Sequence, residues 1–183
     1  MEKIIKKIDR LLQTKSPVIV GIDGPCASGK TTLAKKLADK IGAQVIHIDD
    51  FFLPVKKRTA DSLNTIGGNI DATRFANEIS RGISLKTPTE YGIYSCKEGR
   101  ITETKTLNPE GIIIIEGAYS NLPELCIDYD LKIFVEAPLN IRLSRIQTRN
   151  ADSLNSFINI WIPLENKYFE AYPIKESCDI IIE

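Results

Sequence analysis

The chain has 183 residues, of which 43% are hydrophobic and 26% charged, enough to bury the core of a single domain. Because 24 basic residues balance 24 acidic ones, the overall charge favours neither nucleic acid nor an anionic membrane as partner, and a small neutral or anionic metabolite suits it better. The four cysteines are far apart and no apolar run could cross a bilayer, which argues against zinc sites, disulfides and membrane spans. We expect one soluble, cytoplasmic domain over residues 1–183; its oligomeric state, a homo-oligomer included, stays open.

The first predicted elements are an amphipathic helix, a strand and a phosphate-binding loop. One helical face of the N-terminal segment carries Ile4, Ile5, Ile8, Leu11 and Leu12. The apolar run 18–22 then leads into residues 24–31, which have the complete spacing G-x-x-x-x-G-K-[ST], and a second helical pattern follows as far as Gly42. Glycines let backbone N–H groups turn toward phosphates, and the next helix points its N-terminus at the same anion. The pattern therefore predicts a nucleoside triphosphate site formed by Gly24, Pro25, Cys26, Ala27, Ser28, Gly29, Lys30, Thr31 and Thr32.

Four further aliphatic runs follow along the chain, at residues 43–48, 111–115, 130–135 and 178–182. Short, nearly unbroken, β-branched runs separated by helical stretches are typical of buried parallel strands. Together with the run 18–22 they predict an α/β fold with a doubly wound parallel five-stranded sheet and helices on both faces.

Acidic residues follow two of these predicted strands, where ligands of such sheets lie. Asp49 and Asp50 come after the second run, and Glu116 after the third. Successive side chains of a strand face opposite ways, so the two aspartates should have different roles. Lys30 is expected to reach the β- and γ-phosphates, and Thr31, Glu116 and Asp49 to form the Mg²⁺ site. For each acid, an ordinary loop or helix-capping carboxylate is the alternative.

Residues 53–110 form the longest interval between predicted core strands, and we expect this insertion to hold the phosphate acceptor. A helix can begin at Asp71 and carry Phe75 and Ile79 inward. Residues 91–96 and 100–104 flank a turn, as the strands of a hairpin would.

Three arginines, Arg142, Arg145 and Arg149, recur with helical spacing in the segment of about 138–152. A solvated basic helix face would explain them. A segment that closes over the nucleotide, bringing positive charge to the transferring phosphate, is the functional interpretation.

The order of these elements resembles the uridine kinase-like branch of the P-loop kinases. The phosphate loop is followed by Asp-Asp-Phe-Phe-x-Pro at 49–54, by Ile-Glu-Gly at 115–117 and by Trp-Ile-Pro-Leu-Glu at 161–165, the last resembling compact bacterial members. The resemblance implies the three-layer P-loop NTPase fold, a lid at about 138–152, and ATP and Mg²⁺ as cofactors. It also implies that Asp49 accepts the proton of the acceptor hydroxyl and that Arg145 and Arg149 act catalytically with Lys30.

The acceptor implied by the resemblance is a primary hydroxyl of a nucleoside or similar metabolite. Its candidate contacts are Asp50, Phe52, Arg74, Tyr91 and Tyr119, with core packing as the alternative for the tyrosines. Uridine and cytidine kinases carry a Pro-x-Tyr-Asp segment followed by a histidine and an arginine. This chain has Pro-Thr-Glu-Tyr-Gly at 88–92 instead, and its only histidine, His47, is expected merely to pack in its strand. The acceptor, and the choice between ATP and GTP, stay open; by analogy adenine lies between the arginine segment and residues 173–177.

A different class of protein is the alternative: an NTP-hydrolysing switch, or a nucleotide-binding regulator, that acts on a protein partner. The chain contains no N-K-x-D guanine motif, because residues 166–167 (Asn-Lys) are followed by Tyr-Phe. One acid, rather than a tandem pair, follows the run 111–115, which argues against a motor ATPase. A kinase should hydrolyse ATP slowly until its acceptor arrives, whereas a switch needs a partner protein.

Overall fold

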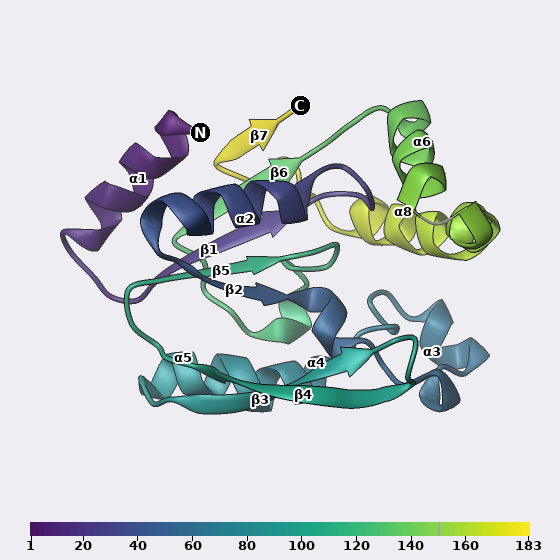
Figure 1. Cartoon of the computed structure of the whole chain (residues 1–183), viewed down its shortest axis with the longest axis horizontal. Helices are drawn as coiled ribbons and strands as arrows, with labels where there is room; N and C mark the ends of the chain where they lie inside the picture. Colours follow the sequence, from purple (N-terminus) through teal and green to yellow (C-terminus); the bar gives the residue numbers. More distant parts are fainter. Residues whose placement is uncertain (150) are drawn as a thin grey trace.

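The computed structural model describes residues 1–149 and 151–183. Within them, five parallel strands form a sheet in the order β2-β5-β1-β6-β7 (Figure 1). The strands are β1 (Val18–Asp23), β2 (Gln44–His47), β5 (Ile112–Glu116), β6 (Leu131–Val135) and β7 (Ile180–Ile182). Each lies within two residues of the run that predicted it, so the parallel five-stranded sheet is confirmed.

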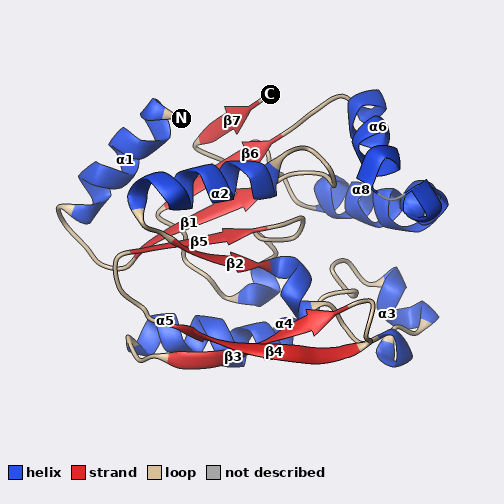
Figure 2. Ribbon diagram, viewed as in Figure 1, coloured by secondary structure: helices blue, strands red, loops and turns tan. Residues whose placement is uncertain are grey.

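Both faces of the sheet are covered, and side chains that alternate along each strand pack into two different apolar clusters. Ile112 and Ile114 face one apolar cluster, which also contains residues of α1 (Glu2–Leu12) and α2 (Lys30–Ile41). Ile113 and Ile115 face the other cluster, whose members come from the segment after β2 and from the C-terminal helices. Figure 2 shows the resulting layers, with α1 and α2 on one side of the sheet and α4 and α5 on the other. The three-layer α/β architecture is therefore confirmed.

The long insertion between β2 and β5 contains short helices and a hairpin. Its elements are α3 (Ala60–Asn64), α4 (Ala72–Phe75), a π-helical turn (Ala76–Ser80), α5 (Arg81–Leu85), β3 (Thr89–Ser95) and β4 (Arg100–Leu107). The predicted helix begins as expected: Asp71 Oδ1 accepts a hydrogen bond from the backbone N of Arg74 at 3.0 Å, and Phe75 and Ile79 are fully buried. β3 and β4 pair antiparallel, which confirms the hairpin.

The C-terminal third supplies α6 (Leu139–Arg149), α7 (Leu154–Ser156), a π-helical turn (Phe157–Trp161) and α8 (Ile162–Ala171). In Figure 1 the strand arrows of the sheet point toward α6 and α8. These helices therefore lie at the carboxyl ends of the strands, where the site is predicted. Among the described residues, no helix has the length and apolarity needed to span a bilayer.

Candidate active site

The phosphate loop connects β1 to α2, and its backbone geometry depends on glycine. Gly24 has φ 140°, and a Cβ there would lie 2.0 Å from the carbonyl oxygen of Val135. Gly29, with φ 118°, directly precedes α2. Lys30 begins that helix, is 7% exposed, and its Nζ donates to the Pro25 carbonyl at 2.9 Å. The N-terminus of α2 and the lysine therefore face the interior of the loop, as an anion-binding site requires.

Thr31 and Glu116 meet beside this loop. The Thr31 hydroxyl donates to the Glu116 carboxylate, with Oγ1 at 3.0 Å from Oε1 and 3.2 Å from Oε2. Glu116 is the last residue of β5 and is 4% exposed. Since β5 lies between β1 and β2, the sheet places this carboxylate directly next to the start of α2.

His47 does more than pack in its strand, so that expectation is wrong. It is paired in register with Glu116 across β2 and β5, and its Nδ1 lies 2.5 Å from Glu116 Oε1. This hydrogen bond to Glu116 raises the pKa of His47, while burial acts in the opposite direction. The imidazole thus orients the carboxylate that contacts Thr31.

Asp49 faces a cavity that Lys30, Thr31 and Glu116 also line. It does so from a turn and not from a strand. β2 ends at His47, and Ile48–Phe51 form a 3₁₀ turn. Asp49 lines the cavity, whereas Asp50 does not. The expected division between the two aspartates therefore holds in space, although its cause is the turn and not strand alternation. The pKa of Asp49 is raised, first because the surrounding protein desolvates the carboxylate and then because Glu116 repels its charge; Lys30 lowers it.

These oxygen atoms fit a magnesium ion. Mg²⁺ prefers hydroxyl and carboxylate oxygens, and it is commonly held by one or two carboxylates together with substrate phosphates. Thr31, Glu116 and Asp49 supply that donor set around one cavity. The described part of the chain contains no cluster of three or more His, Cys, Asp or Glu side chains that could hold a metal without further ligands. The nucleotide phosphates would have to supply the remaining ligands.

The arginines of α6 contact the phosphate loop or line the cavity. Arg142 Nη1 lies 3.4 Å from the Cys26 carbonyl oxygen, and Arg145 Nη1 donates to the carbonyls of Ala27 and Ser28, each at 2.9 Å. Arg149 lines the cavity that contains Lys30 and Asp49. The helix face predicted by spacing is therefore turned toward the loop: Arg142 is buried, whereas Arg145 and Arg149 remain exposed to solvent. Residue 150, within the predicted lid segment, lies outside the described residues.

Glu165 is a part of the site that sequence reasoning missed. The backbone N of Cys26 donates to Glu165 Oε2 at 2.9 Å, which connects α8 to the phosphate loop. Burial raises the pKa of Glu165, and this backbone hydrogen bond opposes the rise. The Trp-Ile-Pro-Leu-Glu motif identified the residue, but nothing in its spacing pointed to a loop 139 positions earlier.

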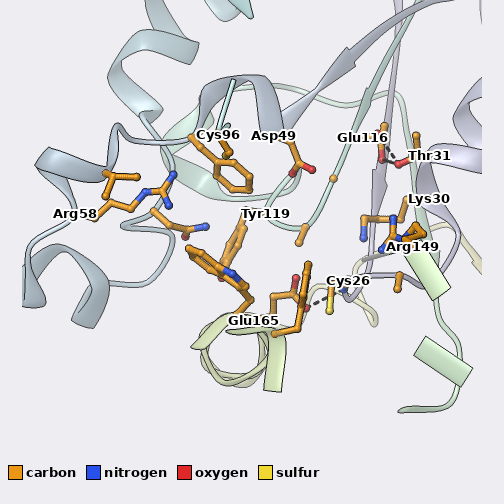
Figure 3. A pocket seen from close by; sticks show the side chains of 18 residues that line it. Cys26, Lys30, Thr31, Asp49, Arg58, Cys96, Glu116, Tyr119, Arg149 and Glu165 are labelled. Carbon is orange, nitrogen blue, oxygen red and sulfur yellow. Dashed lines mark hydrogen bonds between the residues drawn. The ribbon is translucent and has the colours of Figure 1, made fainter. Parts of the chain in front are cut away.

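A cavity of about 400 Å³ joins these groups to the expected acceptor region (Figure 3). Of the five predicted acceptor contacts, Phe52 and Tyr119 line it. Residues that line it and were not predicted include Val55, Arg58, Asn69, Cys96, Phe157 and Trp161. They come from loops, a 3₁₀ turn and a π-helical turn, where the α-helical and strand periods give no information about side-chain direction.

Arg74, Tyr91 and Asp50 are not brought to the cavity. Arg74 Nη1 donates to the Gly92 carbonyl at 2.8 Å, a second guanidinium nitrogen bonds the Asp50 carbonyl, and its charge lies 4.3 Å from the centre of the Phe51 ring. Tyr91 is 5% exposed and stacks on Phe51, with ring centres 6.0 Å apart. Burial raises the pKa of Asp50. The three residues join the hairpin to the turn after β2, so direct contact with the acceptor stays a prediction for them.

A second cavity of about 350 Å³ lies on the other side of the phosphate loop. Its lining includes Pro25 of the loop, Arg142 of α6, and Lys175 and Glu176 from the segment before β7. This is the place where the analogy put the adenine base.

Comparison with known proteins identifies the family of this chain. A model described as the cytidylate kinase-like family matches residues 19–171. Uridine kinases of Clostridium perfringens and Clostridium tetani are 26% and 27% identical, each alignment covering 92% of this chain and 88% of the relative. A solved structure described as a possible uridine kinase from Bacillus stearothermophilus has a TM-score of 0.74 at 21% identity, covering 99% of this chain and 100% of that one. The family model spans well over half of the chain, so this protein belongs to the cytidylate kinase-like family and is a uridine kinase-like P-loop kinase, a kinase of small molecules.

Proposed function

We propose that this chain transfers the γ-phosphate of ATP to a primary hydroxyl of a nucleoside or similar metabolite, with Mg²⁺ as cofactor. One observation carries the proposal: Lys30, the Thr31–Glu116 pair and Asp49 face one cavity that continues into an aromatic chamber. Phosphoryl transfer depends mainly on positioning and on neutralising the charge of the γ-oxygens, and this arrangement offers both.

Each residue has a defined task in the proposal. Lys30 binds the β- and γ-phosphates, and Thr31 with Glu116, and Asp49 nearby, would hold the metal. Bound Mg²⁺ neutralises phosphate charge and orients the transferring group. Asp49 accepts the proton of the attacking hydroxyl, for which its raised pKa is favourable, since a stronger base takes the proton more readily. Arg145 and Arg149 would add positive charge from α6 on closure.

The proposed kinase activity also gives a role to the larger parts of the chain. Residues 1–183 would act as one domain, with the insertion 53–110 holding the acceptor and the segment of about 138–152 acting as the lid. The cavity formed by Pro25, Arg142, Lys175 and Glu176 would take the adenine. A cytoplasmic protein with small-molecule partners, and neither nucleic acid nor membrane, suits this activity.

The test is ADP release from ATP and Mg²⁺ across uridine, cytidine, nicotinamide riboside, pantothenate and phosphosugars, with an acceptor-free control. Stimulation by one acceptor supports the kinase and identifies its substrate class. Lys30→Ala should remove turnover, whereas Asp49→Asn should abolish transfer and leave ATP binding nearly intact. Hydrolysis that ignores every acceptor would favour the alternative, a nucleotide switch that acts on a protein partner.

A further inference from the structure

Arg58 is held rigidly at one end of the main cavity. Its Nε donates to the Leu53 carbonyl at 2.6 Å. The guanidinium lies 5.6 Å from the centre of the Phe52 ring and 5.5 Å from that of Trp161. These two rings stack on each other at 6.4 Å with an angle of 22°. A backbone carbonyl and two aromatic faces therefore fix the direction of this side chain.

The charge of Arg58 is not matched by an acid. Its Nη2 is buried and makes no hydrogen bond to any described residue, and no ion pair involves Arg58 within residues 1–149 and 151–183. The carboxylates that line the cavity are Asp49, Glu116 and Glu165, and two of these bond to the phosphate-loop region. A buried guanidinium nitrogen without a partner is costly, so an arrangement of this kind favours a ligand that supplies an acceptor oxygen.

Figure 3 shows how this charge lies relative to the transfer site. Arg58 is at one side of the cavity, Lys30, Thr31 and Arg149 are at the other, and Asp49 lies between them. The cavity therefore has room for a metabolite whose hydroxyl reaches Asp49 and whose opposite end points toward Arg58.

We propose that Arg58 selects an acceptor that carries an acidic group, a carboxylate or a phosphate, at the end remote from its reactive hydroxyl. The proposal rests on the kinase function proposed above and narrows its substrate class. A charged oxygen fits better than a neutral carbonyl, because it forms charge-assisted hydrogen bonds and neutralises a cation that has no protein counter-charge. Asn69, which is 3% exposed and lines the same cavity, offers an amide group for the same ligand.

The chain contains its own reporter for this test, because Trp161 is its only tryptophan and Arg58 lies against its ring. Tryptophan fluorescence is titrated with two matched pairs: pantothenate with pantothenol, and ribulose 5-phosphate with ribulose. Both are run with a non-hydrolysable ATP analogue and Mg²⁺, and ADP release with ATP is measured in parallel. At least one acidic member should bind about 10- to 100-fold more tightly than its neutral partner, as expected for a charge-assisted contact. The pair that responds distinguishes carboxylate from phosphate.

Variants separate the charge of Arg58 from the fold of its loop. Arg58→Gln should remove the preference for the acidic member, and Arg58→Lys, which keeps the charge without the planar fork, should retain part of it. Lys56→Gln is the matched control, since it removes the same charge from an exposed position two residues away and should change nothing.

The outcomes for the two proposals differ. Equal binding of acidic and neutral members, an unchanged preference in Arg58→Gln, or no fluorescence response to either acid would overturn the role of Arg58. If a neutral acceptor nevertheless stimulated ADP release, the kinase function would stand without it. Arg58-dependent binding of an acid with no phosphate transfer to any compound would leave the role of Arg58 standing and count against the kinase function.

Discussion

Burial and the nearby Glu116 carboxylate disfavour the negative charge of Asp49. The ionisation of Asp49 therefore affects the stability of the folded protein. Its pKa in the folded protein is raised, so the ionised carboxylate is disfavoured relative to the unfolded chain. The resulting loss of folding free energy reaches its full size at a pH above the pKa of Asp49 in the folded protein. It disappears as the pH falls below about 4, the ordinary pKa of an aspartate, where the carboxyl is protonated in both states. The carboxylate that we propose as the proton acceptor thus lowers stability at neutral pH.

Asp49→Asn is therefore expected to raise the melting temperature of the ligand-free protein at pH 7. The gain should shrink as the pH is lowered, since the wild-type carboxyl then becomes neutral as well. Thermal unfolding of both proteins between pH 4 and pH 8, limited to conditions of reversible unfolding, measures the effect. A lower melting temperature of the variant at pH 7 would mean that attraction to Lys30 outweighs desolvation.

Gly24 and Gly99 allow a matched test of close packing at the phosphate loop. Both have positive φ, but a Cβ at Gly24 would lie 2.0 Å from the Val135 carbonyl oxygen, whereas nothing lies within 4 Å of one at Gly99. Gly99→Ala should cost about 1–2 kcal/mol, the price of a left-handed conformation for a residue with a Cβ. Gly24→Ala should cost clearly more and also weaken nucleotide binding. Denaturant unfolding and ATP titration of the two variants check this, and equal losses would contradict the packing argument.

The individual site residues were predictable to different degrees. Lys30, Thr31 and Glu116 are in one place because a loop motif and strand ends determine their positions. Arg58 and Trp161 come from segments whose direction is set by tertiary contacts, so no pattern indicated that they would meet. The same limit explains Arg74 and Tyr91: a polar or aromatic residue in the right interval can as well join two elements as face a ligand.

The helix that begins after Asp71 shows how a short element depends on its cap. The Asp71 carboxylate accepts the hydrogen bond from Arg74 N, and the Asp71 backbone N donates to the Phe51 carbonyl at 2.8 Å. Asp71→Ala should lower stability by about 1 kcal/mol, or roughly 2–4 °C in melting temperature, and Asp71→Ser should restore most of it. Melting curves of the three proteins test this; equal losses in both variants would show that the cap is not what stabilises the helix.

At the level of elements, the sequence predicted strands and helices well and their fine boundaries less well. Long aliphatic runs and turn residues were sufficient for the sheet, the hairpin and the amphipathic N-terminal helix. The 3₁₀ turn Ile48–Phe51 was missed because its apolar residues, Ile48 and Phe51, continue the strand pattern into the core. The π-helical turns were missed because helical periodicity does not distinguish them from α-helix.

For the molecule as a whole, nucleotide binding should be visible as stabilisation, since α6 and α8 both contact the phosphate loop. A ligand at 100 times its dissociation constant adds about 2.7 kcal/mol, which corresponds to about 5–10 °C for a chain of this size. We expect Mg²⁺ and ATP together to produce such a shift, EDTA to remove most of it, and Lys30→Ala to abolish it. A full shift in EDTA would argue against metal-dependent binding; differential scanning fluorimetry decides.

The architecture of the whole chain followed from strand runs alone, but the order of the strands did not. Parallel strands of similar composition could be arranged in several ways, and only the fold shows that β5 lies between β1 and β2. That placement is what brings Glu116 to Thr31 and His47. The phosphate-loop motif and the strand ends indicated the expected roles of Thr31 and Glu116, and the structure adds the contacts that these residues make.

The two ends of the main cavity are made by different stretches of chain. The groups proposed to face the phosphates come from strand ends, the turn after β2, the start of α2 and α6, whereas Arg58 belongs to a short loop outside the sheet. Strand ends and the start of α2 determine the positions of Lys30, Thr31 and Glu116, so these positions tolerate little change, whereas the loop of Arg58 is not part of the sheet. With the function proposed here, related chains could therefore change their acceptor by substituting a few loop residues, while the groups proposed for phosphate transfer stay the same.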